Sequence, residues 1–129
     1  MGIGEKMNSA MDKNVRQTKF QIAELQKRIA VLEATREDLE RQIRKLNDSV
    51  PEDEVESGAQ KDGYVAYGSY AKSVIARKEN LRSSLEDIVT TSSDLSGDLR
   101  VALDALDSFE RVRARQMAAK AEKALKRRA

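Results

Sequence analysis

The sequence predicts an all-α protein, a two-helix antiparallel coiled-coil hairpin whose basic C-terminal helix end projects beyond its partner helix. Charged residues make up 36% of the chain and aromatic residues only 4%, with no tryptophan. This composition is typical of long helices rather than of a globular core. Two heptad seams run through the chain, and its one proline lies between them. The length of 129 residues is that of a single domain.

The first helix is predicted over about residues 10–50, where heptad positions repeat without a skip. β-Branched residues occupy most a positions and leucine occupies most d positions, a division that favours two-stranded packing. Thr18 and Arg36 are the polar members of this seam. Its positions are Met11, Val15, Thr18, Ile22, Leu25, Ile29, Leu32, Arg36, Leu39, Ile43, Leu46 and Val50.

An acidic loop is predicted to follow, over about residues 51–66. Pro51 ends the first seam, because proline cannot continue a helix interior. The segment after it, PEDEVESGAQKDG, contains glycine and many carboxylates and cannot continue a buried helical face. The loop therefore separates two helices that can fold back on each other.

The second helix is predicted over about residues 67–125, again with an unbroken heptad. Lys78 and Ser92 are its polar seam members. We expect Arg36 and Lys78 to lie within about one heptad of each other and to form one hydrated region, a kind of break that commonly sets register. The flanking carboxylates would be Glu33, Glu37, Glu40 and Glu79. The seam positions are Tyr67, Ala71, Val74, Lys78, Leu81, Leu85, Ile88, Ser92, Leu95, Leu99, Ala102, Leu106 and Phe109.

The two seams predict antiparallel pairing within one chain, although a domain-swapped or a parallel dimer would use the same pattern. The charged, alanine-rich pattern continues after Phe109, so we expect the C-terminus to project beyond the first helix. Both ends of the chain are basic and the middle is acidic. The predicted hairpin is therefore polarised, with an acidic turn and a basic end.

The residue inventory argues against an enzyme and against a bound cofactor or metal. The chain has no cysteine and no histidine, which removes the commonest thiolate and imidazole ligands and bases. No apolar run approaches the roughly 20 residues that span a bilayer. We therefore expect a cytoplasmic protein without direct membrane insertion.

Tyrosines and basic residues form a pattern in residues 63–85, GYVAYGSYAKSVIARKENLRSSL. This stretch resembles alphaproteobacterial members of the flagellar FliJ family, which read an aromatic residue, Ala-Tyr, a turn residue, Tyr-Ala-Lys, a basic pair and Asn-Leu. The run LERQI at residues 39–43 is also similar to the family. Gly68 stands where proline is frequent, and the start GIGEKMNSAMDKN is less basic and less leucine-rich than is usual in the family.

The resemblance implies a coiled-coil stalk of the flagellar type III export apparatus. Such a stalk sits in the centre of a hexameric export ATPase ring and reaches the cytoplasmic domain of the export gate, at the inner face of the membrane. Export chaperones are further partners that the family implies. The gate-facing tip would then contain Tyr64, Tyr67, Tyr70 and Val74. The ATPase-facing end would contain Arg111, Arg113, Arg115 and Lys120.

Other interpretations remain open at this point. Tyr67 could cap the hairpin core rather than meet a partner. A coiled-coil regulator could insert its acidic tip into an RNA polymerase channel, acting through Glu52, Asp53, Glu54 and Glu56. A generic coiled-coil scaffold would show the same seams. No nucleic-acid partner is expected, because the basic tail lacks interleaved aromatic residues and the net charge of the chain is only +2.

Overall fold

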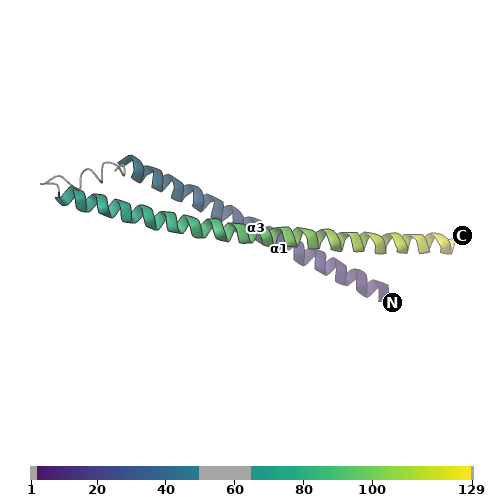
Figure 1. Ribbon diagram of the computed structural model, residues 1–129. Coiled ribbons are helices and arrows are strands. Elements are labelled where there is room, and N and C mark those ends of the chain that lie inside the picture. The colour runs from purple at the N-terminus through teal and green to yellow at the C-terminus, as the bar shows by residue number, and fades with distance from the viewer. Residues whose placement is uncertain (1–2, 50–64, 129) are drawn as a thin grey trace. The chain divides into compact units, whose positions relative to one another are not determined.

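The computed structural model describes residues 3–49 and 65–128, with side chains described in 9–49 and 68–128. Every residue in the two described ranges is helical (Figure 1). Helix α1 spans Ile3–Ser49 and helix α3 spans Val65–Arg128. The prediction of an all-α, two-helix hairpin is confirmed.

The helices are longer than the predicted elements. Helix α1 begins at Ile3 rather than near residue 10, because the residues before Met11 lack a seam but contain no proline that would end a helix. Helix α3 ends at Arg128, after the predicted end near residue 125. The hydroxyl-rich segment TTSSDLSG, which ends at Gly97, stays helical throughout, so its low helix propensity does not interrupt the element.

The chain divides into two compact units, to which both helices contribute. The first consists of Met1–Ile29 and Leu95–Ala129. The second consists of Ala30–Asp94. We call them the terminal unit and the tip unit.

The terminal unit is built on an antiparallel seam. Arg113 Nη1 of α3 donates to Asp12 Oδ1 of α1 at 3.2 Å, and Lys19 Nζ lies 3.9 Å from Glu110 Oε1. Along α1 these contacts run from Asp12 to Lys19, whereas along α3 they run from Arg113 back to Glu110. The two helices are therefore antiparallel in this unit. The buried side chains of this unit are Val15, Thr18, Ile22, Leu25, Leu95 and Ala102.

The tip unit has a smaller buried core. Ala71 and Val74 form a buried cluster, against which Leu46 of α1 and Ile75 pack. In both units, every described position of the two predicted seams is buried or half-buried. Heptad periodicity therefore predicted which face of each helix is packed.

The prediction of one hydrated region around Arg36 and Lys78 is wrong. The Lys78 side chain is 1% exposed, and its ammonium donates to Asn47 Oδ1 of α1 at 2.8 Å. Arg36 instead contacts Glu33 at 2.8 Å and Glu40 at 3.9 Å, both on its own helix. Asn47 lies eleven residues after Arg36, which is about 16 Å of helix. Lys78 thus contacts the opposite helix, whereas these two contacts of Arg36 lie within its own helix.

Candidate interaction surfaces

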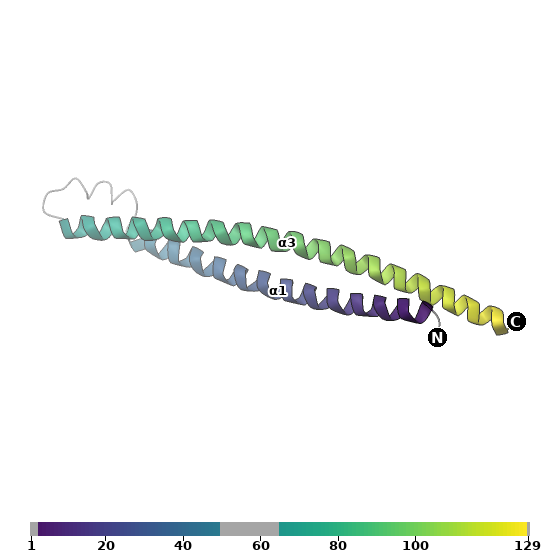
Figure 2. The ribbon, with the colours of Figure 1, turned by 90° about the horizontal axis from the view of Figure 1, so that it is seen from below.

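The basic end of α3 begins where its apolar seam stops. After Phe109 the next heptad positions are Arg113, Gln116, Lys120 and Lys123, and polar side chains cannot continue a dry seam. Arg113 and Gln116 are still half-buried, but every side chain in residues 117–128 is exposed. Within the terminal unit, α3 continues past the start of α1 (Figure 2). We call residues 117–128 the basic end.

The four predicted ATPase-facing residues do not share one environment. Arg111 Nε lies 3.1 Å from Asp107 Oδ2, one turn earlier on α3, and Arg113 is held by Asp12 of α1. Exposed pairs of this kind contribute about 0–1 kcal/mol each. Arg115 and Lys120 are exposed and have no ion pair or hydrogen bond within the described residues. These two cations are therefore the ones available to a partner.

The basic end is also amphipathic. Ala114, Ala118, Ala121 and Leu125 follow one another at spacings of four and three residues, which places them on one face of α3. Met117 and Leu125 remain 61% and 68% exposed. Basic residues flank this face, with Glu122 as the only acid among residues 111–128. The basic residues of that segment are Arg111, Arg113, Arg115, Lys120, Lys123, Lys126, Arg127 and Arg128.

The predicted gate-facing residues are also divided by the structure. Tyr64 lies outside the described residues, and Tyr67 lies in α3 but its side chain is outside the described set. Tyr70 is 55% exposed, whereas Val74 is 5% exposed and belongs to the buried cluster of the tip unit. Val74 therefore packs inside the hairpin, and Tyr70 is the described side chain of this group that a partner can reach.

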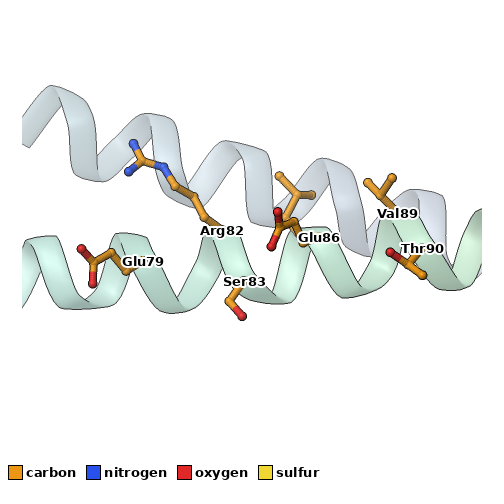
Figure 3. A pocket seen from close by; sticks show the side chains of 7 residues that line it. Glu79, Arg82, Ser83, Glu86, Val89 and Thr90 are labelled. Carbon is orange, nitrogen blue, oxygen red and sulfur yellow. The ribbon is translucent and has the colours of Figure 1, made fainter.

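Sequence analysis did not single out a surface pocket in the tip unit, because its residues share no motif. All of the lining residues belong to α3, and Figure 3 shows Arg82, Glu86 and Val89 projecting from one side of the helix and Ser83 from the opposite side. A depression lined by one helix does not enclose a small molecule as ligand cavities do. The lining residues are Glu79, Arg82, Ser83, Leu85, Glu86, Val89 and Thr90.

Four further findings bear on function. Within residues 3–49 and 65–128, no group of acidic side chains is arranged to hold a metal ion. In the same ranges, neither helix has a stretch long and apolar enough to cross a membrane. The acidic residues Glu52, Asp53, Glu54 and Glu56 lie outside the described residues. Comparisons with protein-family models, with curated proteins and with solved structures gave no match.

Proposed function

We propose that this chain is a FliJ-type stalk of the flagellar type III export apparatus, which contacts a hexameric export ATPase through its basic end and the export gate through its tip unit. The proposal combines the tyrosine and lysine pattern of residues 63–85 with the two-helix hairpin. Of the four residues expected at the ATPase-facing end, the proposal relies on Arg115 and Lys120, together with the basic end, because Asp12 of α1 pairs with Arg113.

The observation that carries the proposal is the exposed helical end of α3. Its heptad positions Lys120, Lys123 and Arg127 are basic, so α1 does not bury them. A helix with this surface is complementary to a protein ring whose interior is lined with acidic residues, because opposite charges speed association. The small residues on one face of the helix allow it to approach that lining closely. The end is therefore a suitable contact for the interior of a protein ring.

The mechanism that we propose requires no bond-making by the stalk itself. A ring of ATPase subunits passes through different nucleotide states, and a ligand shifts such states only as far as its affinity differs among them. One hairpin end is asymmetric, since it presents an apolar face and two basic flanks. It can therefore contact the six subunits unequally and bias their states.

Reversing the charge of Arg115 and Lys120 together is expected to weaken binding to the purified export ATPase by at least about tenfold, or about 1.4 kcal/mol. The reason is that both cations are exposed and have no partner within the described residues. The variant is Arg115→Glu with Lys120→Glu, measured by equilibrium binding at low and at high salt. The difference from the parent chain should shrink as salt rises, because salt screens exposed charges.

The matched control is Lys72→Glu with Arg77→Glu, which reverses one lysine and one arginine on the exposed surface of the tip unit. It changes the net charge equally but leaves the basic end intact. Arg113 is not used, because reversing it would also place a carboxylate against Asp12. Equal weakening by both double variants would argue for non-specific charge attraction and against the proposed contact.

Replacing Tyr70 by alanine is expected to reduce flagellar protein export several-fold while stimulation of the export ATPase is retained. Tyr70 is 55% exposed on the first turns of α3, and tyrosine is enriched among the interface hot spots whose truncation costs about 2 kcal/mol or more. Export can be measured as the amount of secreted flagellar protein, and stimulation as phosphate release by the purified ATPase.

The control is Tyr70→Phe, which keeps the ring and removes the hydroxyl group. Retained export with phenylalanine and reduced export with alanine would indicate a contact made by the ring face. Loss of both export and stimulation with alanine would instead indicate damage to the hairpin, and it would contradict a separate gate contact.

A further inference from the structure

Among the described residues of the tip unit, the most deeply buried charged residue is Lys78. Its side chain is 1% exposed and occupies an a position of the α3 seam. Nζ donates to Asn47 Oδ1 of α1 at 2.8 Å, so the contact joins the two helices. A lysine at a buried seam position is less stabilising than leucine would be, and its usual role is to specify pairing.

Register needs such a contact because the apolar seam is periodic. If α3 moved along α1 by seven residues, most of its seam positions would again face seam positions of α1, most of which are apolar. Leu39 and Leu46 illustrate this, since they occupy equivalent positions one heptad apart. Apolar packing alone therefore distinguishes poorly between the observed register and its neighbours.

The contacts of Arg36 do not distinguish the observed register from its neighbours. Its guanidinium contacts Glu33 and Glu40, and both carboxylates belong to α1. Those contacts move with the helix and remain the same in every register. In the register displaced toward the start of α1, Lys78 would face Glu40, which Arg36 engages here at 3.9 Å. The observed register is the one that gives Lys78 the Asn47 oxygen.

We infer that the hydrogen bond between Lys78 and Asn47 sets the heptad register of the tip unit, and that Arg36, the other charged seam residue of this unit, does not. This inference is independent of the proposed export function, because it concerns only the register in which α1 and α3 pair. It also explains why a seam that would be more apolar with leucine carries a lysine at this position.

The test uses disulfide formation between engineered cysteines, which is free of background because the chain has no cysteine. The pair Leu46→Cys with Val74→Cys reports the observed register, since both residues belong to the same packed cluster. The pairs Leu39→Cys with Val74→Cys and Leu46→Cys with Leu81→Cys report displacements of one heptad in either direction. Each pair is oxidised in a glutathione redox buffer with Lys78 present or replaced.

With Lys78 present, the observed pair should form its intramolecular disulfide and the displaced pairs should not. With Lys78→Leu, the yield of at least one displaced pair should rise by about fivefold or more, because the substitution removes the polar contact between the helices and makes position 78 apolar. Asn47→Ala should raise the yield of the disulfide between positions 39 and 74, because it removes the amide oxygen that Lys78 contacts and a one-heptad shift brings Lys78 to the Glu40 carboxylate.

Ser92→Leu is the matched control, because it makes another polar a position of α3 apolar and keeps Lys78. It should leave all three disulfide yields as they are in the parent chain. The inference is overturned if the displaced pairs stay absent with Lys78→Leu and Asn47→Ala, or if Ser92→Leu raises them equally. Circular dichroism before oxidation can show whether the Lys78→Leu and Asn47→Ala variants are folded.

Discussion

Removing residues 117–129 is expected to abolish binding to the export ATPase and to leave the hairpin folded. All side chains in 117–128 are exposed, and Gln116 is the last half-buried residue of α3. The deletion removes all of the positively charged residues of the basic end, which are Lys120, Lys123, Lys126, Arg127 and Arg128. Binding should weaken by more than about a hundredfold, which corresponds to about 2.8 kcal/mol.

Two measurements separate the effect on binding from an effect on folding. Thermal unfolding followed by circular dichroism should show a midpoint close to that of the full chain, because no described core residue is removed. A shorter deletion, of residues 126–129, keeps Lys120 and Lys123 and should retain part of the binding. If the chain without residues 117–129 binds the ATPase as tightly as the full chain, the basic end is not the contact.

The sequence predicted the packed faces of both helices because a heptad pattern is a local property. Each seam residue reports its own position on the helix, and Val15, Leu95 and Ala102 are buried as that position requires. The end of the apolar seam near Phe109 was also visible, since the next positions, such as Lys120, are charged. The exposed basic end could therefore be anticipated without coordinates.

Contacts between the helices could not be predicted in the same way. Heptad periodicity leaves the register open by multiples of seven residues, so the contact between Lys78 and Asn47 was not determined by the pattern. For the same reason Arg113 was assigned to a partner protein, although Asp12 of α1 holds it in the structure. Helix starts were uncertain for another reason: α1 extends to Ile3 without a seam, because intrahelical hydrogen bonds require no apolar face.

Replacing Leu95 by alanine is expected to lower the free energy of unfolding by about 2–5 kcal/mol. Leu95 is 6% exposed in the core of the terminal unit, so truncation removes buried apolar surface and leaves a cavity. Small domains are stable by only about 5–15 kcal/mol, and this single change would remove a large part of that. The measurement is equilibrium unfolding in urea, followed by circular dichroism. The dependence of the free energy of unfolding on urea concentration is compared between variants.

Leu103→Ala is the matched control, because it changes the same residue type on the same helix and in the same unit. Leu103 is 45% exposed, so its truncation should cost less than about 1 kcal/mol. Alanine and leucine differ in helix propensity by the same amount at both sites, and the difference between the variants therefore reports packing alone. Equal losses at the two positions would mean that Leu95 is not packed against α1, and the assignment of the seam in the terminal unit would fail.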